Sequence, residues 1–124
     1  LAPRTTPQTQ SVVRPSPDLA YSACLFDLND APEGLHVTMA QTAGYSSLSF
    51  FDASTNNFAT YRGNNEEVAI RLLPAGTDST AAGDLTSSTS RGIILIRRLA
   101  PTIEEYDLVE QIAKGDECRV LGAP

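Results

Sequence analysis

Two short polar clusters contain the residues whose types and spacing could bind a ligand. In the first, Asp18 and Tyr21 stand three residues apart, and a carboxylate and a phenol at the start of a strand could face a cleft. In the second, Asp52, Asn56 and Asn57 lie between two aromatic stretches and could offer a carboxylate and two amides to a polar ligand. These are the predicted ligand-binding residues.

Both clusters also have a purely structural explanation, which we favour. Asp18 can accept backbone N–H bonds before the strand, while Tyr21 packs with its hydroxyl group at the rim of the core. Asp and Asn side chains bond to backbone two residues further on and tolerate left-handed dihedral angles, so residues 52–57 are expected first to form a turn. Ligand binding would instead require these side chains to converge around a concave pocket.

Signatures of catalysis are weak in this sequence. A hydrolase could use Asp18, Tyr21, Asp52 and His36 in one cleft, but no G-x-S-x-G nucleophile motif is present. The sequence also has no P-loop and no G-x-G-x-x-G fingerprint. We therefore expect no cofactor, and we keep a hydrolase-type enzyme as an alternative to a non-enzymatic binding module.

Two cysteines, Cys24 and Cys118, leave open a disulfide, two buried thiols or half of a metal site. His36 is the single histidine and there is no C-x-x-C pair, so a zinc site is the weakest of these and we expect no metal. A disulfide would close a loop of roughly 100 residues, worth about 4–5 kcal/mol in the chain-entropy model. It is expected if the protein is exported to an oxidising compartment.

Composition restricts the classes of partner. The chain has 124 residues, of which 41% are hydrophobic and 19% charged, which fits one globular domain. Its net charge of −6 offers no electrostatic footprint for a phosphate backbone, so nucleic acid is not an expected partner. No apolar run reaches the length of about 18 residues that a membrane helix needs. Because the chain starts at Leu1, we expect a targeting segment or anchor to precede it.

Short alternating segments predict a chain made mostly of strands. Residues 1–12 are expected to be a tail or linker and residues 13–124 a single β-rich domain. In the predicted strand 19–28, the inward side chains are Ser22, Cys24, Phe26 and Leu28. In the strand 35–40, they are Leu35, Val37 and Met39. The other predicted strands are 45–52, 56–61, 68–73, 91–99 and 118–123, and residues 75–90 are expected to form a long mobile loop.

The segment 91–99 is the strongest predicted strand. Its four consecutive apolar β-formers suggest a strand covered on both faces. The flanking Arg91, Arg97 and Arg98 are expected to be solubilising ends that discourage edge pairing, with an anion site as the alternative.

One helix is predicted, over residues 102–115. Thr102 and Glu105 have capping-box spacing. The expected apolar stripe consists of Ile103, Tyr106, Val109, Ile112 and Ala113. Many short strands followed by a late helix predict a mostly β fold: an antiparallel β-sandwich or jelly-roll-like domain with one C-terminal α-helix on its flank.

Two stretches resemble the bacterial exported family called domain of unknown function 1254. The segment 13–28 resembles its opening motif, with matches at Pro15, Asp18, Tyr21 and Ser22. Ser16 and Leu19 depart from it, because the family usually has Asn and Thr there. The segment 49–59 resembles the family's aromatic strand followed by Asp and Thr-x-Asn-Phe, with matches at Asp52, Thr55, Asn56, Asn57 and Phe58.

The resemblance implies a β-rich, exported protein and no established activity. It implies a short, single-domain member located in the periplasm and tethered to the inner membrane by an N-terminal segment absent from this chain. The expected function is a non-enzymatic envelope or periplasmic module that binds a small molecule or an envelope protein. A structural domain that forms homo-oligomers is a further alternative.

Overall fold

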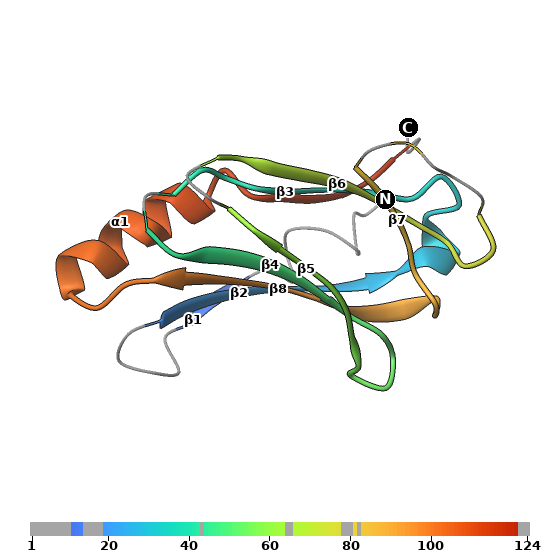
Figure 1. Ribbon diagram of the computed structural model, residues 1–124, viewed down its shortest axis with the longest axis horizontal. Coiled ribbons are helices and arrows are strands. Elements are labelled where there is room, and N and C mark those ends of the chain that lie inside the picture. The colour runs from blue at the N-terminus through green and yellow to red at the C-terminus, as the bar shows by residue number, and fades with distance from the viewer. Residues whose placement is uncertain are drawn as a thin grey trace.

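Two stacked β-sheets and one α-helix form the fold in a computed structural model that describes residues 11–13, 19–42, 44–63, 66–77, 81 and 83–121 (Figure 1). Sheet A has the strand order β1-β2-β8-β4-β5, and sheet B has the order β7-β6-β3-β9. The strands of sheet A are β1 (Ser11–Val13), β2 (Leu19–Asp27), β8 (Arg91–Leu99), β4 (Ser46–Phe51) and β5 (Asn57–Arg62). The strands of sheet B are β7 (Asp84–Thr86), β6 (Val68–Leu73), β3 (Leu35–Met39) and β9 (Glu117–Val120).

The predicted fold class, a β-sandwich with one C-terminal helix, is therefore confirmed. Among the described strands, all neighbours in sheet A pair antiparallel, and in sheet B only β6 and β7 run parallel. A short 3-10 helix (Leu28–Asp30) follows β2. Ser11 and Val12, which the sequence predicts to be part of a tail, lie in β1. No helix among the described residues is long and apolar enough to cross a membrane.

The strand β7 lies inside the segment 75–90, for which the sequence predicts a long mobile loop. That prediction is wrong for Asp84–Thr86, since Leu85 pairs in register with Leu72 of β6. The Arg71 guanidinium donates two hydrogen bonds to the Asp84 carboxylate, at 3.0 and 2.6 Å, and the backbone N–H of Arg71 donates to Gly83. Contacts between residues far apart in sequence, which composition does not reveal, hold this short strand.

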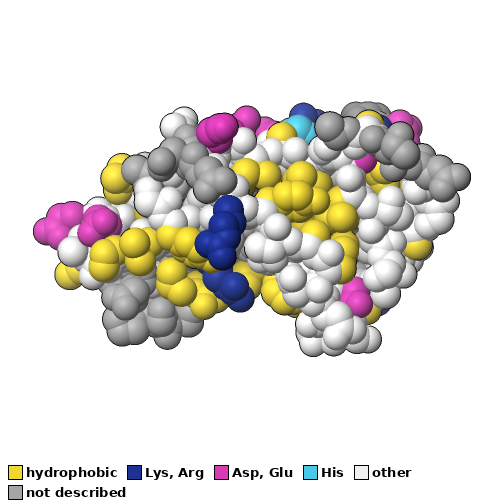
Figure 2. All heavy atoms as spheres, viewed as in Figure 1, with side chains coloured by type: hydrophobic (Ala, Val, Ile, Leu, Met, Phe, Trp, Pro, Cys, Tyr) yellow, Lys and Arg dark blue, Asp and Glu magenta, His cyan; other side chains and the backbone are white. Residues whose placement is uncertain are grey.

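The helix α1 (Ile103–Ala113) has the predicted N-cap, but its predicted apolar stripe is not buried along its whole length. The Thr102 hydroxyl accepts a hydrogen bond from the Glu105 N–H at 3.1 Å, which completes the N-cap. Val109 is buried, but Ile103 is 71% exposed, so its place in the apolar stripe was wrong. The first turn of α1 extends beyond the ends of the strands, where acidic side chains gather (Figures 1 and 2). Among the described residues, neither sheet reaches far enough there to bury Ile103.

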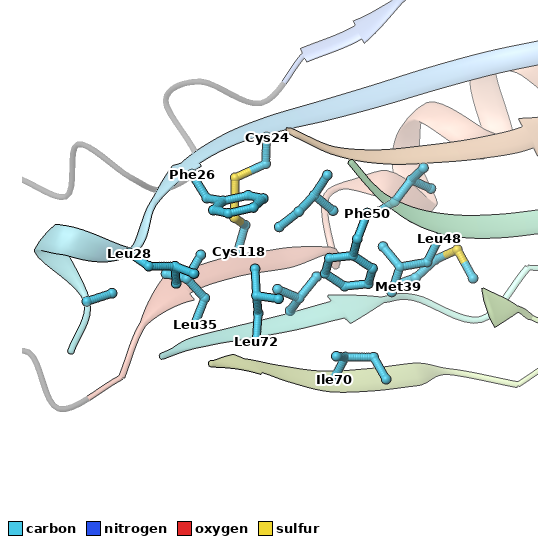
Figure 3. Packing of buried hydrophobic residues seen from close by; sticks show 14 residues of the cluster. Cys24, Phe26, Leu28, Leu35, Met39, Leu48, Phe50, Ile70, Leu72 and Cys118 are labelled. Carbon is cyan, nitrogen blue, oxygen red and sulfur yellow. A yellow bond between two sulfur atoms is a disulfide. The ribbon is translucent and has the colours of Figure 1, made fainter. Parts of the chain in front are cut away.

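The core lies between the two sheets and follows the predicted alternation. Leu35, Val37 and Met39 of β3 are at most 1% exposed. They belong to one core cluster with Cys24 and Phe26 of β2, and Met39 lies beside Leu48 of β4 (Figure 3). The alternation in both strands is confirmed. Each sheet thus buries one face of every long strand against the other sheet.

A disulfide between Cys24 and Cys118 crosses this core (Figure 3). Cys24 belongs to β2 of sheet A and Cys118 to β9 of sheet B, 94 residues later. The predicted bridge is therefore formed, and it links the two layers covalently. No group of three or more metal-ligating side chains exists among the residues that the structure describes.

A buried ion pair provides a second link to the segment before β9. Arg98 is 1% exposed, so the prediction that it is a solubilising strand end is wrong. Its guanidinium donates to both carboxylate oxygens of Asp116, at 2.8 and 2.6 Å, and to the Thr42 hydroxyl at 2.8 Å. Strand alternation explains the burial, because Arg98 shares the inward face of β8 with Ile94 and Ile96.

Candidate functional site

The polar turn between β4 and β5 uses its carboxylate locally. Asp52 Oδ1 accepts hydrogen bonds from the backbone N–H groups of Ser54 and Asn56, both at 2.9 Å. The hydrogen bond from the Asn56 N–H is the main reason that the pKa of Asp52 is lowered. This is the turn that the sequence predicted, with its negative charge held by backbone dipoles.

The side-chain amides of Asn56 and Asn57 make different hydrogen bonds in this turn. Asn56 Nδ2 lies 3.4 Å from Asp52 Oδ2. Asn57 Nδ2 donates to the carbonyl groups of Phe50 and Ala59, at 3.3 and 3.1 Å. The residue with a left-handed backbone is Thr55, with φ of 65°, rather than either asparagine. Ligand binding by Asp52, Asn56 and Asn57 stays a prediction, and the contacts present are those of a turn.

The other predicted site residues lie elsewhere. Asp18 is outside the described residues. Tyr21 pairs with Arg97 of β8, whereas Phe51, next to Asp52, pairs with Ile93. Four residues along β8 separate these two positions, a displacement of about 13 Å at the rise of a strand. The structure therefore does not bring Tyr21 and Asp52 together.

His36 lies on the opposite side of the sandwich. It occupies the outer face of sheet B, where its Nε2 is 3.5 Å from a carboxylate oxygen of Glu117. Within the described part of the chain, the side chains proposed for a hydrolase cleft are thus distributed over two faces.

The two outer faces of the sandwich differ in chemistry. One row across sheet B runs Asp84, Arg71, His36 and Arg119 in register. Arg71 pairs with Asp84 at 2.6 Å, and Arg119 pairs with Glu117 at 3.3 Å. Paired charges of this kind are typical of a solvated face.

The outer face of sheet A is apolar instead. Leu25 is 56% exposed and Leu99 is 40% exposed. Ile93 and Leu95 of β8 are half-buried, so the prediction that β8 is covered on both faces holds only for the face toward sheet B. We define the outer face of sheet A by the apolar side chains that alternate away from the core: Leu19, Tyr21, Ala23, Leu25, Phe51, Ile93, Leu95 and Leu99.

Two arginines border this apolar face. The Arg97 guanidinium lies 5.5 Å from the centroid of the Tyr21 ring, and that of Arg62 lies 5.5 Å from the Tyr45 ring. Figure 2 shows a strip of basic side chains between two hydrophobic areas, over the part of the molecule where Figure 1 places β4 and β8. Among the described residues, neither Arg62 nor Arg97 forms an ion pair.

Ser47 of β4 lies between these arginines in the strand register. It pairs with Arg62 on one side and with Arg97 on the other. Sequence reasoning missed this row, apart from the suggestion of an anion site that included Arg97. The available signal was an arginine at an outward position of an apolar strand, but the partners come from two other strands.

Comparisons with known proteins support the fold and the family. A search of curated proteins gave no match. The crystal structure of the VPA0106 protein from Vibrio parahaemolyticus is similar, with a TM-score of 0.75 at 13% sequence identity over 93% of this chain. This chain spans 31% of the length of that protein, so the likeness concerns the shared fold alone. The sequence profile of the family described as protein of unknown function (DUF1254) matches residues 1–119, and the chain therefore belongs to this family.

Proposed function

We propose that this chain is a non-enzymatic interaction module of the cell envelope that binds a protein partner through the outer face of sheet A. The observation that carries the proposal is the contrast between its two outer faces. Sheet B exposes ion-paired polar side chains, whereas sheet A exposes Leu25 and Leu99 beside half-buried isoleucine and leucine. Contiguous apolar side chains on a sheet face are typical of a surface that becomes covered.

The strand β8 supports a polypeptide as the covering group. Ile93 and Leu95 alternate with the buried Ile94 and Ile96, which is the pattern of a strand packed on both sides. A sheet or helix of another protein supplies side chains at the spacing that such a strand accepts. The predicted small-molecule residues offer no comparable arrangement, because Tyr21 and Asp52 lie apart.

The arginines beside the apolar face indicate which side chains a partner protein would present. Arg62 and Arg97 border the apolar face without a carboxylate partner among the described residues, although the whole chain has a net charge of −6. Two copies placed face to face would bring these arginines toward one another, which opposes a symmetric dimer through this face. A partner with apolar and acidic side chains is complementary.

The disulfide is compatible with an oxidising, exported compartment. Among such oxidising compartments we propose the periplasm, where an N-terminal segment outside this chain would tether the protein to the inner membrane. A tether would hold the module near envelope partners and raise their effective concentration.

Site-specific photo-crosslinking in the host cell tests the proposal. A photoreactive residue at Leu25 or Leu95 reports on the outer face of sheet A, and one at Arg119 serves as the matched control on sheet B. We expect the sheet A positions to give a discrete adduct with one other protein, identified by mass spectrometry, and Arg119 to give none.

Three results would contradict the proposal. If Arg119 gave the same adducts as Leu25 or Leu95, the partner would not bind selectively to the outer face of sheet A. An adduct only with a second copy would favour the homo-oligomer alternative. Absence of any protein adduct would leave the face without a protein partner. Once the partner is purified, Leu25→Glu should weaken its binding by at least about tenfold, because a charge replaces a buried contact, without lowering the melting temperature.

A further inference from the structure

One row of side chains across sheet A combines positive charge with unused hydrogen-bonding capacity. Arg62, Ser47, Arg97 and Tyr21 occupy neighbouring strands in register. All four alternate away from the core. The two arginines are therefore two strands apart, with Ser47 between them, a separation of about 10 Å between their Cα atoms.

Tyrosine rings hold both guanidinium groups. Arg97 stacks on Tyr21 and Arg62 on Tyr45, each with 5.5 Å between the guanidinium carbon and the ring centroid. Stacking leaves the in-plane N–H groups of a guanidinium available to donate hydrogen bonds to a planar oxyanion. The equivalent row on sheet B is already neutralised, since its Arg71 pairs with Asp84 at 2.6 Å.

Two buried polar atoms in this row have no hydrogen-bond partner among the described residues. Ser47 is 1% exposed, yet its hydroxyl group is unpaired, and so is the Nε–H group of the adjacent Arg97. Leaving a buried polar group unpaired destabilises the fold, because the group has lost its hydrogen bonds to water. An oxygen atom that reaches both donors would satisfy them, and the neighbouring Arg62 side chain is exposed.

We infer that Arg62, Ser47 and Arg97 form a binding site for a carboxylate. The two guanidinium groups supply the charge and paired donors, while the Ser47 hydroxyl adds a neutral donor at the base of the site. That this carboxylate belongs to an acidic side chain of the partner protein rests on the proposed function. The site itself depends only on the row geometry.

An NMR titration of the intact chain tests this site. The probe is glutarate, and the signals are the Nε–Hε resonances of Arg62 and Arg97. We expect a saturable shift of both with glutarate and only a linear drift with sodium chloride at equal ionic strength. Arg97→Gln should weaken glutarate binding at least about tenfold and Ser47→Ala about fivefold, in keeping with loss of charged and neutral hydrogen bonds. Arg91→Gln is the matched control, because Arg91 is exposed and already pairs with Asp27 at 3.0 Å.

The stability of the variants separates binding from folding. Ser47→Ala removes an unpaired buried hydroxyl group, so its melting temperature should stay equal or rise while glutarate binding falls. Glutarate shifts no larger than those with chloride, or unchanged in Arg97→Gln, would overturn the inference. Saturation by inorganic phosphate or by vesicles containing phosphatidylglycerol, without saturation by glutarate, would overturn the carboxylate assignment.

The two proposals can fail separately. A crosslink from Leu95 to another protein, without binding of glutarate, would contradict the carboxylate site but not the proposed function. Binding of glutarate, without any protein adduct from Leu95, would contradict the proposed function but not the carboxylate site.

Discussion

Arg98 and Asp116 form a two-pronged ion pair inside the sandwich, with guanidinium–carboxylate distances of 2.8 and 2.6 Å and side chains at most 1% exposed. The Asp116 carboxylate also accepts the backbone N–H of Ala40 at 2.8 Å, and Arg98 donates to the Ala40 carbonyl at 3.2 Å. The pair thus joins β8, the chain after β3 and the chain before β9. Its hydrogen bonds offset the cost of burying two charges.

Removing one member of this pair should be more damaging than removing both. Arg98→Met or Asp116→Leu leaves a buried charge without its partner, and each should lower the free energy of unfolding by about 3–5 kcal/mol. The double variant should lose less than either single variant, as measured by urea unfolding. Arg91→Met is the control, because the exposed pair of Arg91 with Asp27 should contribute at most about 1 kcal/mol. Additive losses in the double variant would contradict this account.

The disulfide should stabilise the fold mainly through the unfolded chain. Cys24 and Cys118 are separated by 94 residues, and closing a loop of that length contributes about 4–5 kcal/mol in the chain-entropy model. We expect reductant, or Cys24→Ala with Cys118→Ala, to lower the urea midpoint markedly. Alkylation followed by mass measurement reports the redox state. Two free thiols in the non-reduced sample would refute the bridge.

Asp52 should make stability depend on pH at the acidic end. Its pKa in the fold is lowered from 3.8, chiefly by the hydrogen bond from the Asn56 N–H. A lowered pKa means that the ionised form stabilises the fold above pH 3.8, and that this contribution is lost as the pH falls through the folded-state pKa. Asp52→Asn should therefore differ from wild type in urea unfolding at pH 7 and converge with it near the acid limit. A difference independent of pH would show that the carboxylate charge is not responsible.

Thr55 carries backbone strain in the same turn. Its φ of 65° is left-handed, which a β-branched residue disfavours by about 1 kcal/mol or more. Thr55→Asn should raise the free energy of unfolding by about 1 kcal/mol, since asparagine tolerates this conformation. Thermal unfolding checks the change, and Thr60→Asn in the neighbouring strand, where backbone is extended, should give no gain. Equal effects at both positions would exclude relief of strain as the cause.

Local sequence patterns were sufficient to predict a residue's environment wherever that environment depends on residues nearby in the chain. The alternation of Leu35, Val37 and Met39 predicted their burial, because successive side chains of a strand point to opposite faces. The capping of α1 by Thr102 followed from the spacing to Glu105. The turn at Asp52 followed from the bonding habits of Asp and Asn side chains, though the identity of its left-handed residue did not.

The sequence was thus sufficient to predict the long strands, the helix cap, the turn chemistry and the family, because each depends on short-range geometry or a linear motif, whereas the short strands β1 and β7 were missed. Only the tertiary structure decided that Arg98 is buried against Asp116 while its neighbour Arg97 faces outward beside Ser47 and Arg62. It also decided which outer face is apolar. These outcomes depend on which strands become neighbours, and strand pairing joins residues that no local pattern links.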